Sequence, residues 1–365
     1  MDFAPLSTSP RLGGWGLILV LIGGGVGCGS SRAGFGTYTS SSGATGGSTS
    51  GSSGAGGSSN GGVSVGGSSG GPPDFGFGDA SAAIVGDGGD ECAPGVGQYI
   101  YVISDSNNLY TFDPTKVPSL GAFALVGPVV CPAMAGSNVN SMAIDRHGGA
   151  WVNYGSPDGS IYKVTTTAPV TCQATSFAPR QSGFTYELGM GFSSDAPGST
   201  AETLYVSDND GPGGSGVPGG GKGLAKLDLT TLLLMPIGRY TGANAGYNAE
   251  LTGTSDAQLF GFFTTTPGDY SPIDKTNGAT PPSGASGYPK TLPTVNASTG
   301  GYAFSFWGGD FYFYTQSTGP STTVTHYHTA TGIAADVMRD IGFTIVGAGV
   351  STCAPRTGAP MGIAQ

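Results

Sequence analysis

The sequence has few charged residues, and few of those are basic. Only 10% of the 365 residues are charged, and 13 lysines and arginines against 23 aspartates and glutamates give a formal net charge of −10. Because no basic stripe is present to neutralise a phosphate backbone, we expect no nucleic-acid partner. With 69 glycines and 25 prolines, much of the chain is also too poor in side chains to build a helical core.

The sequence also lacks an apolar run long enough to span a bilayer. Its densest run, residues 17–22, is far shorter than the roughly 20 residues that a transmembrane helix requires. Preceded by Arg11 and followed by small residues, this run instead predicts a secretory signal peptide over residues 1–27.

A cysteine ends the signal-like segment. Residues 25–28, Gly-Val-Gly-Cys, resemble the lipobox that the lipoprotein signal peptidase cleaves, with a glycine where lipoboxes usually have leucine. The resemblance implies that Cys28 carries a lipid anchor with palmitate, so that the membrane is a partner of the protein. Ordinary secretion and a free thiol at Cys28 are the alternatives.

The segment after Cys28 predicts a disordered tether over residues 28–90. Residues 29–73 are almost entirely glycine, serine, threonine and alanine, a composition that cannot bury enough apolar surface to offset its ordering entropy. Tethers of this kind are typical of exported bacterial lipoproteins. Gly29 in place of aspartate resembles Gram-negative lipoproteins that are sorted to the outer membrane, so we expect lipid anchoring there, facing the periplasm or the cell surface.

An internal repeat fills the rest of the chain. An aromatic or β-branched strand recurs with centres at residues 101, 152, 206, 261 and 313, at intervals of 51, 54, 55 and 52 residues. A second strand follows each of them at 109–113, 161–164, 224–228, 271–274 and 324–328. Third strands are expected at 122–126, 232–237 and 343–346. Strands rich in small residues precede the later repeats at 141–145, 188–192, 251–253 and 302–306.

Four short strands per repeat predict an all-β fold, a β-propeller of about five four-stranded blades over residues 91–355, with a flexible tail at 356–365. The strands rich in small residues suit the innermost position around the axis. The first blade has no clear innermost strand, unless residues 82–85 or the segment after residue 346 supply it. A β-sandwich with accidental periodicity is the alternative.

Two turns carry a resemblance to known propellers. Residues 274–278, Asp-Lys-Thr-Asn-Gly, and 329–332, Thr-Ala-Thr-Gly, resemble the strand-ending phrase of quinoprotein-like propellers. The tryptophan that docks those blades is absent, so the resemblance implies the fold and we expect no cofactor.

Four cysteines remain for disulfides if Cys28 is lipidated, and three connectivities are open to them. We expect Cys131 to pair with Cys172, because both follow the outer strands of adjacent blades. Cys92 and Cys353 bracket the repeats and should pair where a closed ring brings its ends together. Four free buried thiols are the alternative.

Three further patterns resemble metal-binding or phosphate-binding motifs but are incomplete. His326 and His328 share one face of a strand, but no third ligand is evident, so we expect no metal site. Residues 208–211 look like a calcium loop without its remaining acidic positions, and we interpret them as a turn. Residues 216–222 match most of a phosphate-binding loop, but Gly223 replaces the serine or threonine and strands follow.

No catalytic constellation is evident, so the leading hypothesis is a non-enzymatic, monomeric binding or scaffold lipoprotein with a cell-envelope protein or glycan as partner. The alternative is a propeller enzyme, a hydrolase or lyase, that acts on envelope polysaccharide. Its best support is Glu187 and Glu250, which directly precede the innermost strands of adjacent blades. These carboxylates could bind a ligand at the axial rim, or be two solvated loop acids.

Overall fold

A computed structural model describes residues 92–209, 221–295, 300–316 and 319–357 of the chain. The expected signal peptide, lipidated Cys28 and tether, and all but the first two residues of the expected tail, lie outside the described residues. Within the described residues, no helix is long and apolar enough to cross a membrane.

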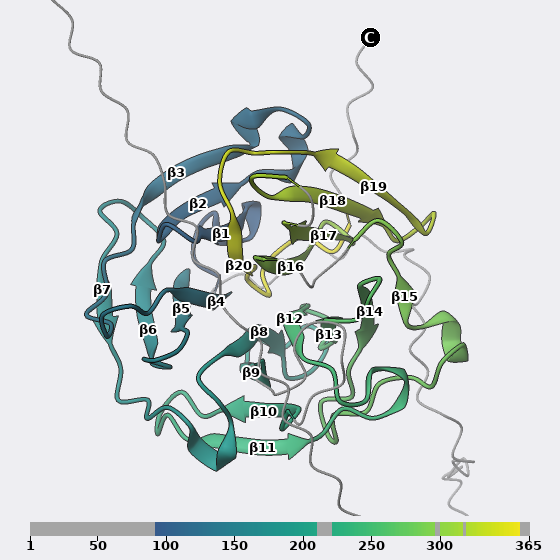
Figure 1. The fold of residues 1–365 in the computed structure, drawn as a ribbon, viewed down its shortest axis with the longest axis horizontal. Helices are drawn as coiled ribbons and strands as arrows, with labels where there is room; N and C mark the ends of the chain where they lie inside the picture. The colour runs from purple at the N-terminus through teal and green to yellow at the C-terminus, as the bar shows by residue number, and fades with distance from the viewer. Residues whose placement is uncertain (1–91, 210–220, 296–299, 317–318, 358–365) are drawn as a thin grey trace, which may run out of the picture. The chain divides into compact units, whose positions relative to one another are not determined.

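The described residues form five four-stranded antiparallel sheets arranged around a central axis (Figure 1), which confirms the predicted five-bladed propeller. From the axis outward, blade 1 contains β20 (Ile345–Gly349), β1 (Ile100–Ser104), β2 (Asn108–Phe112) and β3 (Phe123–Pro128). Blade 2 contains β4 (Val139–Ile144), β5 (Gly149–Tyr154), β6 (Ile161–Thr165) and β7 (Cys172–Ala174).

The other three blades follow in the same order. Blade 3 contains β8 (Leu188–Ser194), β9 (Glu202–Asp208), β10 (Leu224–Leu227) and β11 (Leu234–Gly238). Blade 4 contains β12 (Ala249–Gly253), β13 (Leu259–Phe263), β14 (Asp269–Pro272) and β15 (Lys290–Thr291). Blade 5 contains β16 (Tyr302–Trp307), β17 (Asp310–Thr315), β18 (Thr323–His328) and β19 (Ile333–Met338).

Short 3₁₀ helices connect some of these strands. They are η1 (Val96–Gln98), η2 (Pro114–Lys116), η3 (Leu120–Ala122), η4 (Gln181–Gly183), η5 (Gly242–Asn244) and η6 (Ala285–Gly287).

The inner strands contact one another in the closed order β20, β4, β8, β12, β16 and back to β20. They run in the same direction, since Gly189 of β8 lies against Ala249 of β12, and Gly191 against Leu251. A Cβ atom at Gly191 would lie only 2.8 Å from the carbonyl carbon of Leu251. The small residues of these strands therefore allow neighbouring backbones to approach closely at the axis, as the sequence predicted.

Aromatic side chains of the second strands pack between adjacent blades. Between blades 4 and 5, the ring centroids of Phe260 and Phe311 are 4.9 Å apart, and those of Phe262 and Phe313 are 5.0 Å apart, both edge to face. The recurrent aromatic phrase of the sequence is thus the hydrophobic core between the sheets.

The final strand closes the ring. β20 pairs antiparallel with β1 and supplies the missing innermost strand of blade 1. The segment after residue 346 therefore belongs to this strand, whereas residues 82–85 lie outside the described residues. The prediction that residues 343–346 form a third strand was wrong. The outer strand of blade 5 is β19, whose residues 333–338 are mostly exposed or only partly buried and show no regular apolar–polar alternation in the sequence.

Two disulfides confirm the expected pairing. Cys92 bonds to Cys353, with Cα atoms 6.1 Å apart, and ties the two ends of the ring. Cys131 bonds to Cys172 between blades 1 and 2, with Cα atoms 5.2 Å apart. The sequence predicted that Cys172 follows the outer strand of its blade. The structure places it in that strand, as the first residue of β7.

Candidate functional site

The sequence placed Glu187 and Glu250 at one end of the axis, and the structure brings them to the face at which the inner strands begin. We call this the entry face. Glu187 directly precedes β8, as expected, whereas Glu250 is the second residue of β12 and lies inside the strand. This shift explains their different surroundings: Glu187 is half-buried, while only 2% of Glu250 is exposed.

Glu250 links three blades through its two carboxyl oxygens. The hydroxyl of Ser141 on β4 donates to Oε2 at 2.7 Å, and the amide of Asn209 after β9 donates to Oε1 at 2.9 Å. Ser141 in turn accepts the backbone N–H of Met190 at 3.1 Å. Both oxygens of Glu250 are therefore engaged within the protein.

Burial raises the pKa of Glu250 well above its ordinary value. Hydrogen bonds from Ser141 and Asn209 oppose this shift, and the charge of Glu187 adds to it. The two carboxyl groups are thus close enough to interact, as the sequence suggested. Their role in binding a ligand stays a prediction.

Neighbouring asparagines at the entry face are also engaged. Asn153 is fully buried, and its Oδ1 accepts the backbone N–H of Leu188 at 3.0 Å and the amide of Asn140 at 3.1 Å. One buried acceptor, Oδ1 of Asn248, has no hydrogen-bond partner among the described residues. The Asn153 side chain therefore links the inner strands of blades 2 and 3.

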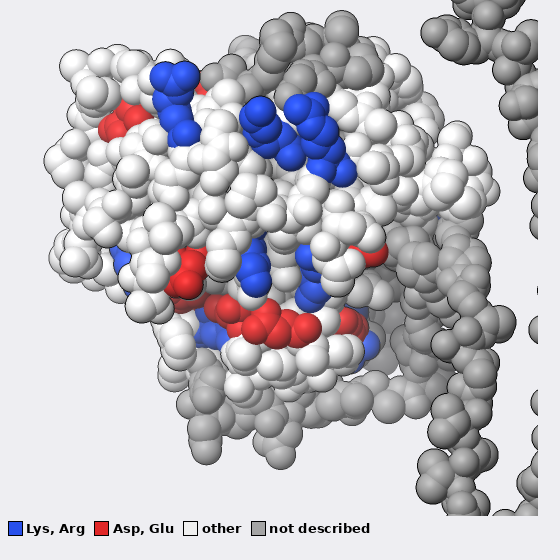
Figure 2. All heavy atoms as spheres, turned by 90° about the horizontal axis from the view of Figure 1, so that it is seen from below, with Lys and Arg blue, Asp and Glu red and all other residues white. Residues whose placement is uncertain are grey.

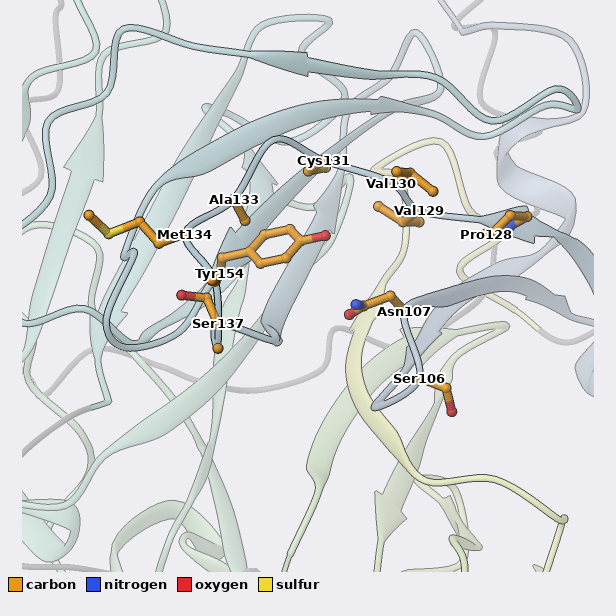
Figure 3. A pocket seen from close by; sticks show the side chains of 12 residues that line it. Ser106, Asn107, Pro128, Val129, Val130, Cys131, Ala133, Met134, Ser137 and Tyr154 are labelled. Carbon is orange, nitrogen blue, oxygen red and sulfur yellow. The ribbon is translucent and has the colours of Figure 1, made fainter.

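A groove opens at the entry face between blades 1 and 2 (Figure 3), with a volume of about 390 Å³. Exposed apolar side chains stand at its edge: 78% of Val130 and 60% of Met134 is accessible. The buried ring of Tyr154 points toward the middle of the groove, with Asn107 across from it. Burial raises the pKa of Tyr154 to about 12 from an ordinary 10.

The loop between β3 and β4, which lines this groove, is held in place by contacts with blade 2. Asp158 accepts the backbone N–H of Met134 at 2.8 Å and the hydroxyl of Tyr162 at 3.0 Å. Cys131, in the same loop, is covalently bound to Cys172 of blade 2. The groove is therefore preformed, a property of sites that bind small ligands or side chains. The sequence showed no signal for it, since Val130, Met134 and Tyr154 come together only when blade 1 meets blade 2.

Two of the incomplete sequence motifs, residues 208–211 and 216–222, lie only partly within the described residues. Asp208 is the last residue of β9, and its side chain accepts the backbone N–H groups of Thr185 at 3.1 Å and Lys222 at 2.8 Å. The interpretation of residues 208–211 as a turn stays a prediction. Of residues 208–211 and 216–222, those between 210 and 220 lie outside the described residues.

His326 and His328 share a face of β18, as predicted, but the expectation that they have no third neighbour was wrong: Asp310 contacts both. Burial would raise the pKa of Asp310, but hydrogen bonds from the two histidines and from Thr329 outweigh it and lower the pKa to about 2. The sequence held one available signal, an aspartate in the strand that pairs with β18.

Charged side chains are sparse on the side of the ring that carries β10 and β11. Figure 2 shows a few lysines and arginines there among uncharged side chains, several acidic side chains close together in one band, and no continuous basic patch on its described part.

Comparisons with known proteins give only distant likenesses. No family model matches the chain, and no curated protein matches it. Among solved structures, it is similar to TolB from Acinetobacter baumannii, with 15% identity over 67% of this chain and 54% of TolB and a TM-score of 0.35. The chain thus spans about half the length of TolB. It is also similar to a protein of unknown function from Bacteroides caccae, with 10% identity over 69% of this chain and 98% of that one and a TM-score of 0.35.

Proposed function

We propose that the protein is a non-enzymatic binding module, exported and held to the outer membrane through a lipid on Cys28. The groove between blades 1 and 2 is its ligand site, and an apolar segment of a cell-envelope protein is its ligand. The observation that carries this proposal is the preformed groove with Val130 and Met134 exposed at its edge.

The carboxyl groups at the axis favour binding over catalysis. A general acid must reach a substrate atom, with a pKa suited to the proton transfer. Glu250 is buried, and Ser141 and Asn209 occupy both of its oxygens. Both of its oxygens accept hydrogen bonds from residues of other blades. A polysaccharide hydrolase or lyase that uses Glu187 and Glu250 is therefore the weaker candidate.

Apolar recognition fits the composition of the groove. The exposed part of Val130 and Met134 would be removed from water by an apolar partner, which stabilises a complex by roughly 25 cal/mol for each Å² buried. Asn107 and Ser137 at the same groove carry polar atoms that can hydrogen-bond a peptide backbone.

The binding test uses the purified full chain, immobilised and exposed to envelope proteins, peptidoglycan fragments and lipopolysaccharide. Val130→Asp and Met134→Asp should each reduce retention of an envelope protein at least tenfold. Ile333→Asp is the matched control, because Ile333 is as exposed as Met134, at 61%, but lies on β19 of blade 5.

The same assay separates the alternative. Retention of a glycan that Glu187→Gln or Glu250→Gln abolishes, with the groove variants unaffected, would support a polysaccharide-directed site at the axis and overturn the groove.

The anchor is tested in growing cells. Radiolabelled palmitate should label the wild type and not Cys28→Ala, because a thioether-linked lipid requires the cysteine. Equal labelling of both proteins would show that Cys28 does not carry the lipid. That result would not bear on ligand binding in the groove.

A further inference from the structure

Three side chains that can ligate a metal ion meet on blade 5, on different strands from the groove and from Glu250. His326 and His328 lie on one face of β18, and Asp310 begins the neighbouring strand β17. Because Tyr312 pairs with His326 in the register of these strands, Asp310 stands opposite His328. The two histidines alternate along one strand, so their rings face the same side as the aspartate.

The potential ligand atoms are already close together. Oδ2 of Asp310 is 2.9 Å from Nε2 of His326, and its Oδ1 is 3.0 Å from Nδ1 of His328. All three ligand atoms lie within 4.8 Å of one another. The side chains are 15%, 25% and 51% exposed for Asp310, His326 and His328, so an ion can reach them from solvent.

Neighbouring groups hold two of the three side chains in place. The ring of Tyr312 stacks on His326 with centroids 4.7 Å apart and an interplanar angle of 4°. The backbone N–H of Thr329 donates to Oδ1 of Asp310 at 2.9 Å, and the Thr329 hydroxyl donates to the carbonyl of Gly309 at 2.6 Å. Such partners orient ligands in metal sites. The more exposed His328 is the side chain that can rotate toward an ion.

We propose that Asp310, His326 and His328 bind a zinc ion, with water in the fourth position. Two imidazoles and one carboxylate suit this ion, whereas calcium and magnesium prefer sites made of oxygen ligands. Ligands at about 2.0–2.1 Å from a tetrahedral centre are about 3.3 Å apart. The 2.9 Å between Oδ2 of Asp310 and Nε2 of His326 is within a few tenths of an ångström of that value. Nδ1 of His328 now contacts the other carboxyl oxygen, Oδ1, so rotation of His328 is needed to bring it to the same ion.

Zinc binding requires a lone pair on the ring nitrogen of each histidine that now faces Asp310. Each imidazole now directs a ring N–H at the Asp310 carboxylate. A neutral histidine moves that proton to its other ring nitrogen and offers the freed lone pair to zinc, while a protonated histidine releases one proton to solvent. The carboxylate exchanges a hydrogen bond for a bond to the metal.

Isothermal titration calorimetry of the purified full chain with zinc chloride tests the site. The wild type should bind one zinc ion at this site with a micromolar or lower Kd. His328→Ala should weaken that binding about 100-fold. Because half of the His328 side chain is exposed, this variant should fold normally. His147→Ala removes the third histidine of the chain, outside the cluster, and should bind zinc like the wild type.

A second readout keeps the result specific. Cobalt(II) in place of zinc should give ligand-field absorption bands in the wild type and His147→Ala, and these bands should be lost in His328→Ala and Asp310→Asn. All variants retain Cys28, so any metal bound there is common to every arm. Equal zinc affinity in the wild type and His328→Ala, or absence of binding to the wild type, would show a hydrogen-bonded Asp–His cluster only and overturn the proposal.

Discussion

At the scale of single residues, the most consequential side chain is Glu250, a carboxyl group that has been brought into the interior of the ring. Its hydrogen bonds reach Ser141 on blade 2 and Asn209 directly after β9 of blade 3, while its own strand belongs to blade 4. Burial raises its pKa above the ordinary value, because the apolar surroundings penalise the charged form. We interpret it as a fastener between blades.

This interpretation predicts different outcomes for two substitutions. Glu250→Gln is neutral and of equal size, and should change the free energy of unfolding at pH 7 by no more than about 1 kcal/mol. Glu250→Ala leaves the donors of Ser141 and Asn209 unpaired beside a cavity, and should cost about 2 to 4 kcal/mol. Urea denaturation followed by tryptophan fluorescence measures both. A large loss in Glu250→Gln would mean that the charged form stabilises the fold.

Glu202, at the start of β9, provides a second titrating residue. It accepts the backbone N–H of Arg146 and the hydroxyl of Thr352, both at 2.7 Å. Burial raises the pKa of Glu202 to about 7 from an ordinary 4.5, although the hydrogen bond from Thr352 opposes the shift. The folded protein therefore holds this proton more tightly than the unfolded chain does.

The sign of the pH dependence follows from that difference. Glu202 stabilises the fold below about pH 4.5, and this stability, on the order of 3 kcal/mol, is lost as the pH rises through about 7. Glu202→Gln should flatten the decline between pH 4.5 and 7 in chemical denaturation. Asp269, whose pKa burial raises to about 6, should preserve part of the decline in the variant. Superimposable pH profiles for both proteins would refute the role given to Glu202.

At the scale of elements, the inner strands depend on residues without side chains. Gly189 and Gly191 of β8 face the backbone of β12, and Gly347 and Gly349 of β20 face that of β4. A side chain at Gly189 or Gly191 would overlap the β12 backbone, and one at Gly347 or Gly349 would crowd the β4 backbone. The close approach, and not a turn, is what requires glycine there.

Gly191→Ala should therefore destabilise the ring, by about 3 kcal/mol, because the added methyl group overlaps the carbonyl of Leu251. The thermal midpoint by circular dichroism measures the effect. Gly121→Ala is the control: Gly121 is exposed in η3, and an added Cβ would meet only the Ser119 hydroxyl, at 3.3 Å. That variant should stay within about 0.5 kcal/mol of the wild type. Equal effects at the two positions would contradict the packing argument.

At the scale of the whole molecule, the ring is closed twice at blade 1. β20 pairs with β1, and the Cys92–Cys353 disulfide joins positions 261 residues apart. Cys131 and Cys172 are only 41 residues apart. Longer covalent loops remove more entropy from the unfolded chain.

Replacing Cys92 and Cys353 with serine should lower the free energy of unfolding by on the order of 5 kcal/mol, and replacing Cys131 and Cys172 by about 4 kcal/mol. Guanidinium denaturation of the two double variants compares them. If removal of the shorter loop costs clearly more, ring closure by β20 alone suffices, and the disulfide at the groove is the main staple.

Much of this architecture could be predicted from the order of the residues. The spacing of the aromatic strands indicated five blades because each blade needs the same packing face. The small residues indicated the inner strands, since only they fit at the axis. Cysteine positions at the ends of the repeat indicated the bond that ties the ring. These features are local or periodic, so they can be recognised from the linear sequence.

Which residues meet could not be predicted in this way. β19 has no apolar alternation, and β20 belongs to the first blade because closure joins segments from opposite ends of the chain. The groove forms where two blades meet, and Asp310 reaches His326 and His328 through strand register. Contacts between distant segments depend on how the sheets pack around the axis, and that packing leaves no periodic signal in the sequence.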